Sequence, residues 1–179
     1  VGGTLTLQYA MNTTGGTGGS ANFTHTRGTL DANNMNVTSR TFFSNGTATR
    51  TLTMGSGTWS LTSTGTVWNT STTTGLTFNA NTSTIKITNT TNTANSFTGG
   101  GLTFNNIWWS RGASTASNTI AGSNTFADFK DDGTVAHSIL FTAGSIVIEK
   151  VLFSVLTLPA GKELSEELIA PTNCCGLIP

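Results

Sequence analysis

The stretch Gly75-Leu76-Thr77-Phe78-Asn79 recurs further along the chain as Gly101-Leu102-Thr103-Phe104-Asn105. A repeat at an interval such as that from residue 75 to residue 101 is typical of solenoids, in which each coil of the chain stacks on the coil before it. Phenylalanines echo the spacing, since Phe42 and Phe97 lie about two periods apart, and Phe126 follows about one period later. The repeat predicts that the two copies are successive rungs of one stacked coil and, by itself, predicts no chemistry.

Short runs of alternating polar and apolar residues fill the spaces between the repeats, and each run favours a β-strand with one buried face. Examples are residues 4–7, 51–54, 58–62 and 84–88, and glycines and asparagines separate the runs. Three runs make one period. An antiparallel sandwich has no reason to repeat a sequence at this interval, so we expect an all-β, parallel β-solenoid (β-helix) of about six to seven coils.

The composition fits stacked coils. By count, 38 Thr, 17 Asn, 17 Ser and 21 Gly make up just over half of the 179 residues, and only 9% are charged. Stacking places equivalent side chains directly above one another, which favours Thr and Asn ladders outside and apolar ladders inside, and disfavours like charges. Zero net charge argues against a nucleic-acid partner. No run reaches the ~18 apolar residues that a membrane-spanning helix requires.

Two segments are expected, with a boundary near residue 145. Residues 1–145 are the Thr/Asn/Gly-rich solenoid; residues 146–179 combine an apolar strand with a short helix over 162–169, as a cap or an assembly segment. Adjacent Cys174 and Cys175 are either free thiols or form an intermolecular disulfide. Residues 1–120 hold five bases and one acid, and residues 121–179 hold three bases and seven acids. This asymmetry reflects either a change of structure or head-to-tail complementarity between copies.

Several segments resemble the Thr/Gly-rich repeat proteins of tailed-phage tails and fibres and related bacterial surface proteins. The resemblance covers about residues 25–145 and is carried by segments 49–62, 65–68, 81–88, 96–101, 122–129 and 140–144. It implies a structural β-solenoid and transfers no catalytic residue. From residue 146 onward the chain departs from the pattern.

Two groups of residues are candidates for binding or catalysis. Asp128, Asp131 and Asp132 could supply paired carboxylates or a metal site, or could form a solvated turn. The four tryptophans could contact a glycan or another subunit, and in a strand one ring of an adjacent pair lies inside and the other outside. These are Trp59, Trp68, Trp108 and Trp109.

Neither histidine lies in a catalytic motif, and the Thr-x-Thr triplets at 24–26, 47–49, 51–53 and 82–84 do not follow the register of the repeat. The sequence therefore favours a non-enzymatic structural protein without metal or cofactor, a subunit of a virion appendage or of an extracellular filament, located in a virion, outside the cell or at the cell surface. Its partners would be copies of itself, other virion or filament subunits, or a host-surface glycan. A carbohydrate-binding or polysaccharide-cleaving module and an ice-binding protein are the alternatives.

Overall fold

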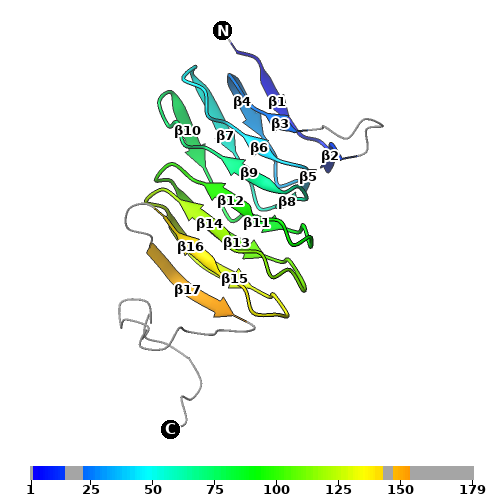
Figure 1. The fold of residues 1–179 in the computed structure, drawn as a ribbon. Helices are drawn as coiled ribbons and strands as arrows, with labels where there is room; N and C mark the ends of the chain where they lie inside the picture. The colour runs from blue at the N-terminus through cyan, green and yellow to red at the C-terminus, as the bar shows by residue number, and fades with distance from the viewer. Residues whose placement is uncertain (1, 15–21, 143–146, 154–179) are drawn as a thin grey trace.

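A computed structural model describes residues 2–14, 22–142 and 147–153 of the chain (Figure 1). These residues form a parallel β-solenoid of about six turns, without a helix in the described ranges, which confirms the predicted fold class. The helix expected over 162–169 and the two cysteines lie outside the described residues.

Three parallel sheets, A, B and C, form the sides of the solenoid. Sheet A has four strands: β1 (Thr4–Thr6), β4 (Gly28–Asp31), β7 (Arg50–Thr53) and β10 (Leu76–Asn79). Sheet B has seven: β2 (Met11–Asn12), β5 (Val37–Ser39), β8 (Thr58–Leu61), β11 (Thr84–Ile87), β13 (Thr103–Trp109), β15 (Thr125–Asp131) and β17 (Val147–Phe153). Sheet C has six: β3 (Phe23–Thr24), β6 (Phe42–Phe43), β9 (Gly65–Asn69), β12 (Asn95–Thr98), β14 (Asn118–Ala121) and β16 (Ile139–Phe141).

Asparagine and glycine build the corners between sheets A and B. Asn34 and Asn81 have φ values of 63° and 51°, a left-handed conformation that asparagine tolerates better than most residues. Their side chains bridge neighbouring turns, because Asn81 Oδ1 accepts from the Gly55 backbone N–H at 3.3 Å and Asn34 Oδ1 accepts from Ser56 N–H at 3.0 Å. A side chain at Gly55 would collide with the Asn34 backbone, 2.5 Å from an added Cβ.

The two copies of the Gly-Leu-Thr-Phe-Asn repeat are not partners in one ladder, contrary to the expectation from their spacing. β10 pairs with β7 and is the edge of sheet A, whereas β13 belongs to sheet B. Corner residues 80–83 separate β10 from β11, but Asn105 runs directly into Asn106 within β13. We call the number of residues along the chain between two ladder partners the ladder shift. The ladder shift is shorter, by the length of that corner, for the pairs β11–β13, β13–β15 and β15–β17 than for the pair β7–β10.

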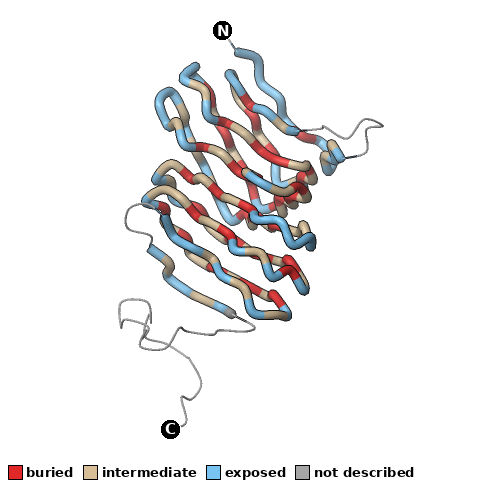
Figure 2. Tube along the Cα trace, in the orientation of Figure 1, coloured by how far each residue is buried: buried red, intermediate tan, exposed pale blue. Residues whose placement is uncertain are grey.

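Aromatic rings form a continuous stack inside the solenoid, within the buried interior drawn in Figure 2. Phe42 contacts Trp68 with ring centroids 4.6 Å apart, and Trp68 contacts Phe97 at 5.8 Å. Phe97 then meets Phe126 across the core at 5.8 Å, from the opposite sheet. The spacing of Phe42 and Phe97 thus marks two turns of sheet C, but the spacing of Phe97 and Phe126 marks a contact between sheets. Burial of each ring contributes roughly 1.5–3 kcal/mol to the free energy of folding.

The ladder of strands in sheet B continues past the boundary expected at residue 145. β17 pairs in parallel with β15, from Thr125 opposite Val147 to Asp131 opposite Phe153. The apolar run expected to form a strand therefore adds a further rung to sheet B.

Candidate functional site

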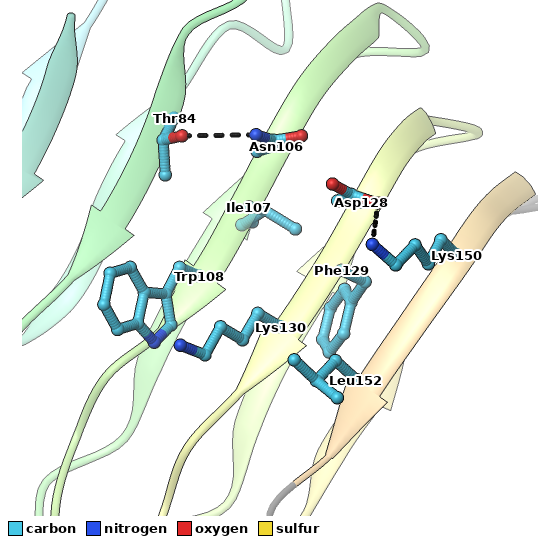
Figure 3. Close-up of a pocket in the computed structure, with 9 residues that line it drawn as sticks. All are labelled: Thr84, Asn106, Ile107, Trp108, Asp128, Phe129, Lys130, Lys150 and Leu152. Carbon is cyan, nitrogen blue, oxygen red and sulfur yellow. Dashed lines mark hydrogen bonds and ion pairs between the residues drawn. The ribbon is translucent and has the colours of Figure 1, made fainter. Parts of the chain in front are cut away.

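The outer face of sheet B carries polar, charged, aromatic and apolar side chains on neighbouring strands. Two columns of side chains run across its last four strands, in register along the ladders. The first column is Thr84, Asn106, Asp128 and Lys150; the second is Lys86, Trp108, Lys130 and Leu152. Figure 3 shows most of these residues around a hollow of about 180 Å³.

Trp108 lies between two lysines, and we call Lys86, Trp108 and Lys130 the lysine–tryptophan site. The Lys86 ammonium is 3.6 Å from the centroid of the Trp108 ring, and the Lys130 ammonium is 3.9 Å from it. Lys86 reaches the ring from β11 and Lys130 from β15, the strands on either side of β13. A cation over an indole gains roughly 0.5–1 kcal/mol at an exposed site. The ring nitrogen Nε1 is covered and has no hydrogen-bond acceptor among the residues that the structure describes.

The predicted group of three aspartates does not converge on one point. Asp128 faces outward, with its carboxylate 3.8 Å from the Lys150 ammonium (Figure 3). Asp131 faces inward and contacts His137 Nε2 at 2.7 Å, and Asp132 accepts a hydrogen bond from the Ser110 hydroxyl at 3.3 Å. Among the described residues, no three His, Cys, Asp or Glu side chains are grouped so as to hold a metal ion.

Three of the four candidate tryptophans lie inside the core. Trp59 and Trp68 are 0% exposed and Trp109 is 1% exposed, so none of their rings is available to a glycan or another subunit. Trp108 is partly exposed on the outer face. The expected alternation of Trp108 and Trp109 across the sheet is present, and the contact prediction is reduced to Trp108.

Both histidines are held by neighbouring groups. His137 Nδ1 lies 2.8 Å from the Val135 carbonyl oxygen, and its Nε2 faces Asp131. His25 Nε2 lies 3.1 Å from the Gly28 carbonyl oxygen, and its Nδ1 lies 3.4 Å from the Ser44 hydroxyl. Burial lowers the pKa of His25, the Gly28 contact opposes that shift, and the Arg50 charge adds to it. No serine, histidine and carboxylate are linked in series among these contacts.

Two buried arginines tie loops to the body of the solenoid. The Arg50 guanidinium donates to the Ser44 hydroxyl at 2.8 Å and to backbone carbonyls of residues 44, 48, 72 and 74. Arg111 donates to the side chain of Asn118 and to carbonyls of residues 89, 91 and 93. Burial lowers the pKa of both guanidinium groups. Because loop carbonyls already occupy both arginines, their role is structural.

A threonine array on sheet A was not visible in the sequence. Thr4, Thr29, Thr51 and Thr77 stand in one register column, and Thr6, Asp31, Thr53 and Asn79 stand in the next. The shift along the ladder differs from one strand pair to the next, so the aligned threonines are unevenly spaced in the sequence. A search at one fixed period therefore misses the array, although the strand ladders bring the side chains together.

Comparison with known proteins yields no assignment: no family model matches the chain, and no curated protein or solved structure matches it significantly. Within the described ranges, no helix is long and apolar enough to span a membrane.

Proposed function

We propose that the chain is a non-enzymatic structural protein, a solenoid subunit of a virion appendage or of an extracellular filament. The observation that carries the proposal is the C-terminal end of the described stack. There β16 and β17 are the edges of sheets C and B, and edge strands pair readily with another chain.

Apolar side chains accompany these edges. Leu140 is 58% exposed, Phe141 42%, Val147 52% and Leu152 55%. An apolar surface beside open strand edges is a typical subunit interface. The proposal therefore places assembly contacts at this end of the stack.

The two ends of the described stack differ in cross-section. The N-terminal end presents edges β1, β2 and β3, whereas sheet A ends at β10 and does not reach the C-terminal end. A second copy stacked head to tail could not continue all three ladders. Contact between like ends, or with a different subunit, fits this geometry better than the head-to-tail complementarity suggested by the charges.

The test is the mass of the full chain in solution, measured by light scattering over a wide range of concentrations. We expect assembly, and we expect Leu140→Lys and Val147→Lys to weaken it, because a lysine at an apolar interface loses hydration. Tyr9→Lys is the matched control, since Tyr9 is 84% exposed at the other end. A monomer at every concentration, or an equal loss with Tyr9→Lys, would contradict the proposal.

Ice binding is a second candidate, favoured by the threonine array on sheet A. Regular hydroxyl and methyl groups on a flat ladder can order water into a lattice, and the outward residues on β1 and β7 repeat Thr-x-Thr in register. Asp31 interrupts the array with a charge. Thermal hysteresis of the full chain tests this function, with Thr51→Lys expected to abolish it and Thr119→Lys, on sheet C, expected to leave it unchanged. No hysteresis in the native chain would eliminate this candidate.

A further inference from the structure

We propose that Lys86, Trp108 and Lys130 bind the carboxylate or sulfate groups of an acidic polysaccharide. This inference goes beyond the structural function, and Lys86, Trp108 and Lys130 are not among the residues that the proposed function places at the assembly surface. It assigns a ligand chemistry to the outer face of sheet B, at the hollow drawn in Figure 3.

The two lysines bring like charges to the two sides of one ring, and the described residues supply no counter-ion to either. Their strands, β11 and β15, are two strand spacings apart, about 9.6 Å. Both side chains nevertheless lean toward the intervening ring, and their ammonium groups lie 3.6 Å and 3.9 Å from its centroid. Charges closer than the Debye length of about 8 Å at physiological salt repel one another with little screening. No ion pair to either lysine is present among the described residues.

The nearby carboxylates are committed elsewhere. Asp128 pairs with Lys150, and Asp132 accepts a hydrogen bond from Ser110. The positive charge of Lys86 and Lys130 is therefore left to an external anion.

Hydrogen-bond donors also outnumber acceptors at the site. Each ammonium carries three donors, and the Trp108 indole N–H is covered without an acceptor in the described part of the chain. A carboxylate or sulfate that lies over the outer edge of the Trp108 ring, within reach of Lys86 and Lys130, would supply acceptors to both ammonium groups and, with a small shift of Lys130, to the indole. Binding of such an anion would thus satisfy a donor that the protein itself leaves unpaired.

The surroundings favour a polysaccharide. The hollow is lined by Trp108 and by apolar Leu152, which lies beyond Lys130 on β17, and such apolar side chains suit the C–H face of a sugar ring. The adjacent column supplies hydroxyl and amide groups from Thr84 and Asn106, joined by a 3.3 Å hydrogen bond, for sugar hydroxyls. The ladder continues these polar positions from strand to strand, so that a linear polymer can lie across them.

The test measures binding of the full chain to immobilised polymers by surface plasmon resonance. Polygalacturonate presents carboxylates, dextran sulfate presents sulfates, dextran is the neutral control, and polyglutamate is an acidic peptide. We expect binding to one or both acidic polysaccharides that weakens as salt is raised, and little binding to dextran or polyglutamate.

Substitutions locate the site. Lys86→Gln and Lys130→Gln should each weaken binding at least tenfold, and Trp108→Phe, which keeps a ring but removes the N–H, should weaken it several-fold. Arg27→Gln is the matched control, because it removes one exposed positive charge outside sheet B. Circular dichroism verifies that each variant is folded. Absence of binding to both acidic polysaccharides, equal binding to polyglutamate, or an equal loss with Arg27→Gln would each overturn the proposal.

Discussion

The early turns of the solenoid have three sides, and the later turns have two. From β1 to β12 each turn contributes a strand to sheets A, B and C, whereas from β13 onward seven-residue strands in sheet B alternate with strands in sheet C (Figure 1). The difference at the transition is the corner formed by residues 80–83, which has no counterpart between Asn105 and Asn106. This short corner thus determines whether a repeat forms its own side or extends the next one.

The two regions also satisfy their buried polar groups differently. The three-sided region uses Arg50 together with a His25 whose pKa is lowered by burial. The two-sided region uses Arg111 and the buried contact between Asp131 and His137, whose side chains are each 7% exposed. Substitutions at matched positions can therefore separate the contributions of the two regions.

The largest expected effect is the loss of a buried arginine. Arg50→Met in the three-sided region and Arg111→Met in the two-sided region should each lower the free energy of unfolding by at least about 3 kcal/mol, because several buried carbonyls lose their donor. Urea unfolding followed by circular dichroism measures both. Arg40→Met is the control, since Arg40 makes a single 3.3 Å bond to the Ser63 hydroxyl and should cost under about 1 kcal/mol. Equal losses in all three variants would refute this assignment.

Asp131 should contribute more than Asp128, although both lie on β15. Asp131→Asn weakens the buried contact with His137 and should cost about 2 kcal/mol, because charge-assisted bonds in the interior are stronger than neutral ones. Asp128→Asn removes an exposed pair with Lys150 and should cost under about 1 kcal/mol. Chemical denaturation at neutral pH compares the two, and a larger loss for Asp128→Asn would reverse our assignment of the two carboxylates.

Tryptophans of the two regions should differ by a smaller amount. Trp68 Nε1 donates to the Thr70 hydroxyl at 2.9 Å, whereas Trp109 Nε1 is buried and no described residue accepts a hydrogen bond from it. Both substitutions to Phe remove similar volume, but Trp109→Phe also removes an unsatisfied donor. It should therefore cost about 1 kcal/mol less than Trp68→Phe. Thermal unfolding curves give the comparison, and the opposite order would show that the indole N–H is satisfied.

The smallest effect is the pH dependence contributed by His25. Because burial lowers its pKa in the folded chain, the unfolded chain binds the proton more readily. The stability contributed by neutral His25 is therefore complete above the ordinary pKa of 6.5 and is lost as the pH falls from that value toward the folded pKa. His25→Gln should show a weaker loss of stability than the native chain between about pH 7.5 and about pH 5, measured by urea unfolding at each pH. An unchanged pH dependence would contradict the prediction.

The sequence was sufficient to predict the fold class because repeat spacing, alternation and low charge all follow from stacking. Its limit was the register. A single fixed period identified the correct architecture but paired residues 75–79 with 101–105, which lie in different sheets. The number of residues between ladder partners varies with the length of the corners. A missing corner, such as that between Asn105 and Asn106, is recognised only when the structure shows which sheets the neighbouring strands join.

The candidate site was predicted only in part, for the same reason. Alternation predicted that one of two adjacent tryptophans faces outward, and Trp108 does. The lysines beside it are distant in the sequence, Lys86 before it and Lys130 after it, so they become neighbours only through the ladder register. The acidic cluster illustrates the converse, because its three aspartates are close in sequence but face different surroundings.

The most direct test of the change from three sides to two is disulfide cross-linking in a background without Cys174 and Cys175. Thr103 stands opposite Thr125 in the β13–β15 ladder, so Thr103→Cys with Thr125→Cys should form a disulfide. The repeat spacing alone would instead pair Thr103 with Thr77, which lies on the edge strand of sheet A. We predict that mild oxidation links the first pair and leaves the second reduced. Efficient linking of Thr77→Cys with Thr103→Cys, and none between positions 103 and 125, would contradict the account.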